Sequence, residues 1–455
     1  MFSFAQIAQP FHGASVNRRI LRAAASVSAA VVLVKLVATV KEFAVAGVFG
    51  RSDDMDAFLA AALIPGLLIN LISESMNQAL VPTLVRVRQT EGQERAQQLL
   101  SSSMLWLCLL LAGASAVMAL TARGFFPLIA SHFPAAKLDL SVRLFYALLP
   151  IVLLSGIAAN CTAVLNTFER FAWPAIAPVA TPVAMMACAL VLSHRIGIWA
   201  LVYGYLAGAL IHVCIVTWMM DLLGYRFRLR WHGMTESTRE VAGQYGPVLL
   251  SGVVASGGLL VDQSMAAMLP AGSVAALAYA GRFVSVVLTL MAGAVSTAVV
   301  PYFSSMIAAD DWAGCRHTLR TWAKLTALAS APIAAGLILG AHLLIRITFQ
   351  HGAFRPADTA AVTPVLAMYA IQIPFFASSR VFYRFLVAMR RTDLVLYCGI
   401  LNLGLDIVLN LILMRRFGVA GIALATSLWT VSTFFFLWYW TWRLLPKERP
   451  AEVAA

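Results

Sequence analysis

Long apolar segments separated by short polar ones follow one another along almost the whole chain of 455 residues. A helix needs about 20 consecutive apolar residues to cross a bilayer, and twelve segments approach that length. They lie near residues 25–48, 57–80, 101–121, 142–166, 173–193, 198–220, 245–269, 273–300, 322–346, 360–386, 393–414 and 419–441. This pattern predicts an all-α integral membrane protein with about twelve transmembrane helices.

The composition supports a membrane protein and excludes most soluble classes. Hydrophobic residues make up 61% of the chain and charged residues only 12%, whereas about 25% of a soluble domain is charged. The net charge of +13 is typical of loops that face anionic lipid headgroups, so membrane lipids rather than nucleic acid are the expected partners. Six scattered cysteines without a CxxC pair predict neither a disulfide framework nor a metal site.

The distribution of basic residues predicts the orientation. With the N-terminus inside, 20 of the 33 Lys and Arg residues lie on the cytoplasmic side and 8 on the other. The positive-inside rule therefore places both termini in the cytoplasm, and an even number of spans agrees with it.

The two halves of the sequence resemble each other. ALVP at 79–82 is matched by AVVP at 298–301, and RIGIWALVYG from Arg195 is matched by RFGVAGIALA from Arg416. The nearly equal offsets indicate a duplicated unit of six spans, related by an axis along the membrane normal. The expected organisation is an N-terminal segment, two six-helix lobes around a linker, and a tail: 1–23, 24–222, 223–243, 244–442 and 443–455.

Four charged residues lie in or beside the first two spans: Lys35, Lys41, Glu42 and Asp56. A charge at bilayer depth costs a few kcal/mol and usually faces a bundle interior or a polar cavity. Lys35 lies too deep to reach an interface, which favours a cavity-facing role. For Lys41 and Glu42 the alternative is snorkelling to the interface, and for Asp56 it is capping of a helix N-terminus.

Arg282 is a further charge, within the eighth span. Its candidate partners are Asp262 on the preceding span or a substrate anion, and a guanidinium can bind phosphate oxygens in a bidentate fork. Arg143 and Arg380 occupy matching places in the fourth and tenth spans and rank lower, because snorkelling explains them equally well.

No catalytic signature occurs in the chain. The sequence contains no GxxxxGK[ST] loop, no GxSxG and no HExxH, so we expect a transporter rather than an enzyme. No cofactor is expected. Transport would instead be coupled to an ion gradient or the membrane potential.

Several motifs, taken together and in order, carry a family resemblance. They are FGRSDDMDAFLAAALIP, ALVPTL, LLPIVLLSGIAANCTAVLNTFERFAWPAIAPV, YGPVLL, GSVAALAYAGRF and FQHGAFRPAD. The sequence resembles the MurJ/MviN family of lipid II flippases from about residue 20 to 440. The resemblance implies two six-helix lobes around a central cationic cavity in the bacterial inner membrane. It also implies movement of an undecaprenyl-pyrophosphate-linked sugar from the cytoplasmic to the periplasmic leaflet.

The resemblance assigns a substrate site to four residues: Lys35, Lys41, Asp56 and Arg282. In the family both first-span positions are arginines, so the lysines here keep the charge and lose the fork. The family's tandem arginines late in the second span fall on Ile69 and Asn70, and Asn70 is kept as a lower-ranked site candidate. The predicted spans also include no counterpart of the family's extra C-terminal helix pair, which forms a groove for the lipid tail.

These residues favour a flippase that holds the substrate pyrophosphate while the two lobes rock. Lipid II or a related peptidoglycan or polysaccharide intermediate is the expected cargo, and proteins of cell-envelope glycan synthesis are candidate partners. The alternatives are an exopolysaccharide or O-antigen repeat-unit flippase, a cation-coupled drug exporter, and a non-transporting scaffold of an envelope synthesis complex.

Overall fold

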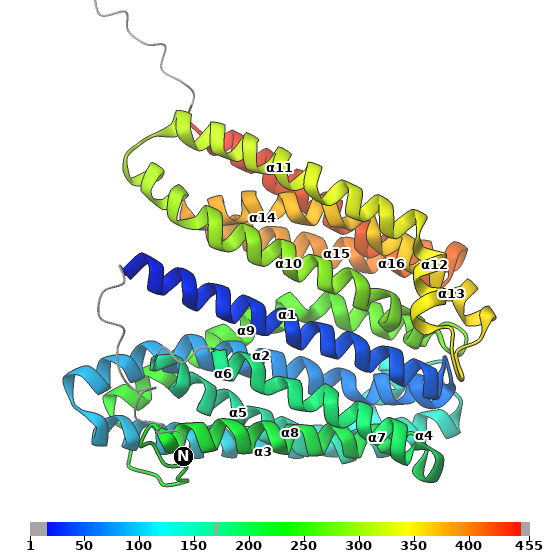
Figure 1. Cartoon of the computed structure of the whole chain (residues 1–455), viewed down its shortest axis with the longest axis horizontal. Helices are drawn as coiled ribbons and strands as arrows, with labels where there is room; N and C mark the ends of the chain where they lie inside the picture. The colour runs from blue at the N-terminus through cyan, green and yellow to red at the C-terminus, as the bar shows by residue number, and fades with distance from the viewer. Residues whose placement is uncertain (1–15, 169–171, 390, 447–455) are drawn as a thin grey trace, which may run out of the picture.

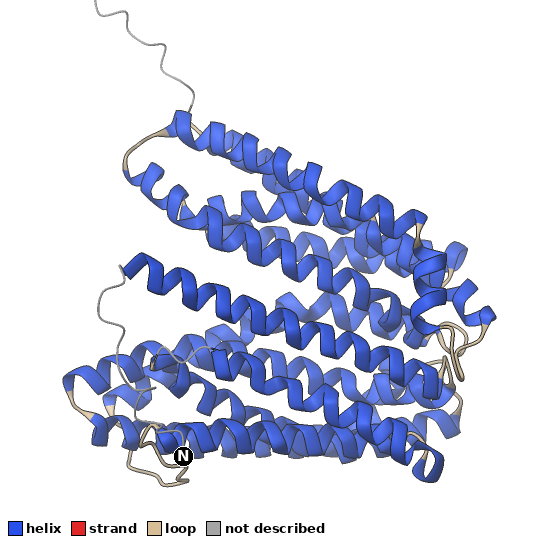
Figure 2. Cartoon of the chain, in the orientation of Figure 1, coloured by secondary structure: helices blue, strands red, loops and turns tan. Residues whose placement is uncertain are grey.

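The computed structural model describes residues 16–168, 172–389 and 391–446, and the regular structure of this part of the chain is entirely helical (Figure 2). The first half contains α1 (Val16–Phe49), α2 (Asp53–Thr90), α3 (Gln93–Ile129), α4 (Ala135–Leu148), α5 (Pro150–Thr167), α6 (Ala172–Ile176), the 3₁₀ helix η2 (Ala177–Val179), α7 (Ala180–Ile196) and α8 (Trp199–Leu222). The second half contains α9 (Glu236–Ala267), α10 (Ser273–Ala308), α11 (Trp312–Leu339), α12 (Ala341–Phe349), α13 (Pro356–Ala370), α14 (Gln372–Ala388), α15 (Thr392–Phe417) and α16 (Val419–Leu444).

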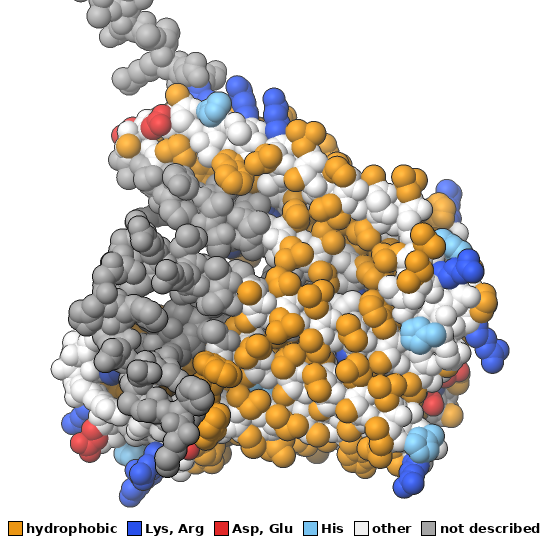
Figure 3. Space-filling model, in the orientation of Figure 1, with side chains coloured by type: hydrophobic (Ala, Val, Ile, Leu, Met, Phe, Trp, Pro, Cys, Tyr) orange, Lys and Arg blue, Asp and Glu red, His pale blue; other side chains and the backbone are white. Residues whose placement is uncertain are grey.

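All twelve predicted crossings fall on helices. In the described residues, ten helical segments are long and apolar enough to cross a membrane. The other two predicted crossings are α1 and α9, and α1 carries Lys35, Lys41 and Glu42. Figure 3 shows hydrophobic side chains over the middle of one face, with charged and histidine side chains gathered toward its two ends. This is the surface of a multi-pass membrane protein.

The helix boundaries support the predicted duplication. Helices α2 and α10, the second long helix of each half, begin at Asp53 and Ser273. The turns at Gly197 and Gly418 have nearly the same backbone conformation, with φ 57° and ψ −136° at the first and φ 56° and ψ −134° at the second. A positive φ favours glycine at both turns. The RIG and RFG motifs therefore mark equivalent corners of the two halves.

In Figure 1, α2 to α8 of the first half lie below α1, and α10 to α16 of the second half lie above it. Helices α1 and α10 approach each other at the end of the molecule near α12 and α13, and separate toward the other end. Helix α9 packs on α2 and α3 of the first half and on α15 and α16 of the second. We call the first end, with residues 50–52, 268–272 and 350–355, the clamp end, and the other, with residues 223–235, the linker end.

The linker is shorter than its predicted range of 223–243, since α9 begins at Glu236. Thr235 caps that helix, its Oγ1 accepting a hydrogen bond of 3.2 Å from the backbone N of Thr238, as Thr does at helix N-termini. Of the predicted terminal segments, residues 1–15 and 447–455 lie outside the described residues.

Candidate functional site

One carboxylate joins α1 of the first half to α10 of the second. Glu42 accepts a hydrogen bond of 2.8 Å from Lys41 Nζ, and the same Oε1 atom accepts one from Arg282 Nη2. Only 8% of the Glu42 side chain and 12% of the Lys41 side chain is exposed, against 33% for Arg282. Lys41 and Glu42 therefore do not snorkel to an interface, and the carboxylate partner of Arg282 is Glu42 rather than Asp262.

Lys35 adds a further positive charge beside this group. It lies six residues before Lys41, about 9 Å away along the helix axis, is half-buried, and lies close enough to Arg282 for the two positive charges to repel each other. Two basic side chains thus contact the Glu42 carboxylate and a third lies nearby, so the group carries an excess of positive charge. A multivalent anion bound near it would find cationic donors from both halves of the molecule.

Asp56 belongs to a different part of the structure. Ser52, not Asp56, caps α2, through a bond of 3.2 Å from Met55 N to Ser52 Oγ. The Asp56 carboxylate instead accepts bonds from Gly272 N (2.6 Å) and Ala275 N (2.8 Å), so it caps α10 of the other half. Asp56 therefore caps a helix N-terminus, as the alternative prediction held, but the helix is α10 and not α2.

Lys137 neutralises this buried acid. Its Nζ lies 2.9 Å from Asp56 Oδ2 and 2.7 Å from Asp53 Oδ1, and it sits over the Phe133 ring at 4.1 Å from the centroid. Only 6% of the Lys137 side chain and 2% of the Asp56 side chain is exposed. The Asp56 charge is therefore balanced within its own half while its oxygens reach across to the other half.

Further contacts between the halves surround Asp56. Arg51 donates from Nε to Gly272 O at 3.0 Å and pairs through Nη1 with Asp358 Oδ1 at 3.4 Å. Tyr279, fully buried, donates from its hydroxyl to Gly50 O at 2.8 Å. We refer to these groups, together with Asp56, as the clamp.

Glycine permits the close approach of α1 and the segment 350–355 at the clamp. Ala353 N donates to Gly47 O at 2.7 Å, and His351 Nε2 lies 3.1 Å from Phe43 O. A Cβ atom on Gly47 would lie 2.6 Å from the His351 ring, and one on Gly352 would lie 2.1 Å from Gly47 O. Any side chain at these two glycines would force the halves apart or displace the contacts between them.

The lower-ranked candidate residues lie elsewhere. Arg143 is exposed and pairs with Asp139 at 2.6 Å, one helical turn away. Asn70 is exposed on α2. Arg380 stacks on Phe376, with the guanidinium 4.2 Å from the ring centroid. The structure brings none of these three into contact with the Glu42 group.

Asp262 takes part in a buried oxygen-rich cluster of the second half. Its Oδ1 accepts from Asn410 Nδ2 at 2.8 Å and its Oδ2 from Thr426 Oγ1 at 2.9 Å, while Asp406 Oδ1 accepts from Asn410 at 3.0 Å. Carboxylate, amide and hydroxyl oxygens are the donors that hard cations prefer. Within the described part of the chain no three His, Cys, Asp or Glu side chains gather as metal ligands.

Sequence reasoning missed Lys137 and Arg51, which it counted only among the basic residues on the side opposite the cytoplasm. The helical period carried a signal for Lys137. Counting along α4 from this lysine, Ser141, Phe145 and Leu148 follow at steps of four, four and three, all on the buried face. A lysine on such a face requires a buried acid as its partner. No comparable signal marked Arg51, which lies in the turn after α1.

Comparison with known proteins places the chain in a family. The family described as lipid II flippase MurJ matches residues 45–454. The probable lipid II flippase MurJ of Vibrio cholerae is 26% identical over 426 residues, which cover 91% of this chain and 81% of that protein.

Solved structures show the same fold. A lipid II flippase MurJ in an inward closed conformation superposes with a TM-score of 0.79 at 22% identity, covering 92% of this chain and 88% of that one. An inward-facing multidrug resistance transporter of the MATE family gives a TM-score of 0.74 at 12% identity, covering 91% and 94%. With a family match that extends over most of its length and a fold that agrees, the chain belongs to the lipid II flippase MurJ family.

Proposed function

We propose that this protein is a lipid II flippase of the bacterial inner membrane, and that Lys35, Lys41 and Arg282 bind the pyrophosphate of its substrate. The observation that carries the proposal is the shared carboxylate of Glu42, which holds a lysine of one half and an arginine of the other at the same oxygen. The names of the matched family and relatives support lipid II as the cargo.

The negative charge of a pyrophosphate must be balanced by positive charge as the group crosses the membrane. Leaving phosphate charge bare in a low-dielectric region would cost many kcal/mol. Lys35, Lys41 and Arg282 supply cations, and Glu42 keeps two of them together while the site holds no substrate. Substrate oxygens would then replace or join Glu42 as their partners, and Arg282 alone would offer a bidentate fork.

The clamp would serve as the gate that alternates with this site. Its bonds connect the halves at one end, while α1 and α10 separate toward the other end (Figure 1). Rocking of the halves would break the clamp and open a path on that side. The excess of Lys and Arg at the linker end supports a cytoplasmic linker and cytoplasmic termini, which would make the clamp a periplasmic gate.

A polysaccharide precursor is the second candidate cargo, because it would carry the same undecaprenyl pyrophosphate. Ile69 and Asn70, where the family has arginines, are the observation that favours it. Expression in a strain depleted of its lipid II flippase tests the main proposal, which predicts restored growth. If growth is not restored there, and the protein instead rescues a strain that lacks a polysaccharide repeat-unit flippase, the cargo would be a polysaccharide precursor.

Protein partners follow from the same proposal. A flippase must receive its lipid-linked substrate from the enzymes that build it, so we expect cell-envelope glycan synthesis proteins nearby. Co-purification after crosslinking in the native membrane is the measurement that checks this expectation.

A further inference from the structure

The segment that joins the two halves crosses the linker end as an ordered strap. Residues 225–232 read YRFRLRWH and form no helix. Tyr225 is buried against the Phe168 ring, with centroids 5.5 Å apart. At the far end, His232 N donates to Ser102 Oγ at 3.1 Å.

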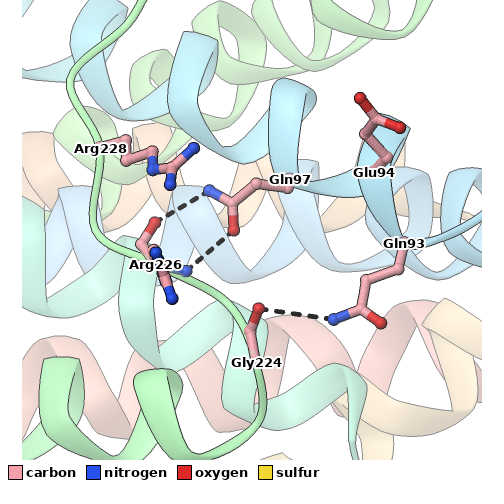
Figure 4. Close-up of a pocket in the computed structure, with 6 residues that line it drawn as sticks. All are labelled: Gln93, Glu94, Gln97, Gly224, Arg226 and Arg228. Atoms are coloured by element: carbon pink, nitrogen blue, oxygen red, sulfur yellow. Dashed lines mark hydrogen bonds between the residues drawn. The ribbon is translucent and has the colours of Figure 1, made fainter.

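Gln97 fixes the middle of the strap. Its amide donates to Arg226 O and accepts from Arg226 N, both at 2.9 Å (Figure 4). This pair of bonds imitates the pairing of a neighbouring strand and fixes the backbone at that residue. Between Tyr225 and His232 the side chains alternate between arginine and large apolar residues, and all six are exposed: Arg226, Phe227, Arg228, Leu229, Arg230 and Trp231.

A basic pocket lies between the strap and the first turns of α3. Arg226 and Arg228 line it together with Gln93, Glu94 and Gln97, and its volume is about 370 Å³ (Figure 4). Arg226 also lines the adjoining pocket, together with Asp221, Gly224 and Phe227. Within the described part of the chain, neither guanidinium forms an ion pair.

The start of α3 adds to the positive potential of this pocket. Gly92 precedes the helix and has no side chain that could cap its first turn. The free N–H groups of a first turn give a helix N-terminus a partial positive charge that attracts anions. Glu94 is the one acid in the lining and opposes two guanidiniums and the helix terminus.

The apolar side chains of the strap are exposed. Phe227, Leu229 and Trp231 are 39%, 51% and 46% exposed, directly after α8, whose last turns expose Trp218 and Leu222. Aromatic side chains with arginines beside them are typical of the headgroup level of a bilayer. Exposed apolar side chains on a fixed backbone are stable there because acyl chains cover them.

We propose that the strap binds an anionic phospholipid, with Arg226 and Arg228 holding its phosphate in the pocket and Phe227, Leu229 and Trp231 inserted beside its acyl chains. The pocket volume suits a phosphoglycerol headgroup and is small for a disaccharide-peptide. The site is built on α3 and the strap, apart from the cations of α1 and α10, so it does not depend on the flipped cargo. Bound lipid would fix the connection between the two halves to the membrane surface.

Native mass spectrometry of the purified full chain, titrated with phosphatidylglycerol, tests the proposal. R226Q/R228Q should bind its tightest phosphatidylglycerol about 30-fold more weakly than the wild type, the loss expected for two basic side chains near an anionic lipid. The matched control is R415Q/R416Q, which removes two exposed arginines at the other end of the bundle. It should bind like the wild type, and R226K/R228K should recover most of the affinity.

Quenching of tryptophan fluorescence by brominated phosphatidylglycerol gives an independent readout, and W231F should lose part of the quenched signal. Equal affinity of R226Q/R228Q and wild type for phosphatidylglycerol would overturn the proposal. Equal losses of affinity in R226Q/R228Q and R415Q/R416Q would also overturn it. Titration with undecaprenyl pyrophosphate distinguishes the lipid source. If the strap arginines were needed for that lipid and not for phosphatidylglycerol, the phospholipid assignment would be wrong.

Discussion

Asp56 binds the backbone N of Ala275, a residue 219 positions further along the chain, at 2.8 Å. The two halves of the sequence repeat at nearly the same offset, so Asp56 and Ala275 occupy equivalent places in the two halves. Residues related by a two-fold axis meet only where they lie close to that axis. The starts of α2 and α10 therefore mark the approximate position of the axis at the clamp end.

This geometry explains why the clamp suits a gate. Rocking of the halves would separate these contacting groups, and hydrogen bonds weaken steeply with small displacements. Lys137 would stay with Asp56 during such a movement, because both belong to the first half. Opening the clamp would therefore release Asp56 from α10 without leaving its charge unpaired.

Loss of Lys137 should destabilise the protein. K137M leaves the buried Asp56 carboxylate without a cation, and removing one partner of a buried ion pair costs about 3–5 kcal/mol. We expect a clearly lower melting temperature in detergent. In the double variant K137M/D56N much of this loss should be recovered, and additive losses would contradict the pairing.

A side chain at Gly47 should loosen the clamp. The Cβ of G47A would lie 2.6 Å from the His351 ring, so the ring must move and its contact with Phe43 O is lost. A cysteine at the buried position Ala275 should then react faster with a membrane-impermeant thiol reagent than in the parent protein.

The double variant G47A/H351A supplies the control, because removing the imidazole restores the space. Its A275C labelling rate should return toward that of the A275C protein with Gly47 intact. Fast labelling that persists in the double variant would show that the ring is not the obstacle.

Removal of the Arg282 charge should reduce transport. R282Q removes a charge-assisted contact worth about 1.5–3 kcal/mol, so flipping in reconstituted vesicles should fall about 10- to 100-fold. R143Q is the matched control, since Arg143 is exposed and pairs only with Asp139 among the described residues. A similar fall in both variants would point to a general effect of charge.

The sequence predicted the helices and part of the site. The twelve apolar segments were sufficient to predict the membrane-crossing helices, since the length of a span follows from the thickness of the bilayer. The Lys41–Glu42 pair was also predictable, because the two residues are adjacent. The bond from Arg282 to Glu42 joins residues 240 positions apart, and only the packing of α1 on α10 determines it. Asp56 was misassigned for the same reason, as its partners are backbone groups of the other half.

The central claim is that the cations held by Glu42 bind a pyrophosphate. Its most direct test is the affinity of the purified full chain for undecaprenyl pyrophosphate, measured by native mass spectrometry for wild type, K41Q, R282Q and R143Q. We predict that K41Q and R282Q bind this lipid at least about tenfold more weakly than wild type, as expected when a charged contact is lost, and that R143Q binds it equally well. Unchanged affinity in both K41Q and R282Q would contradict the account.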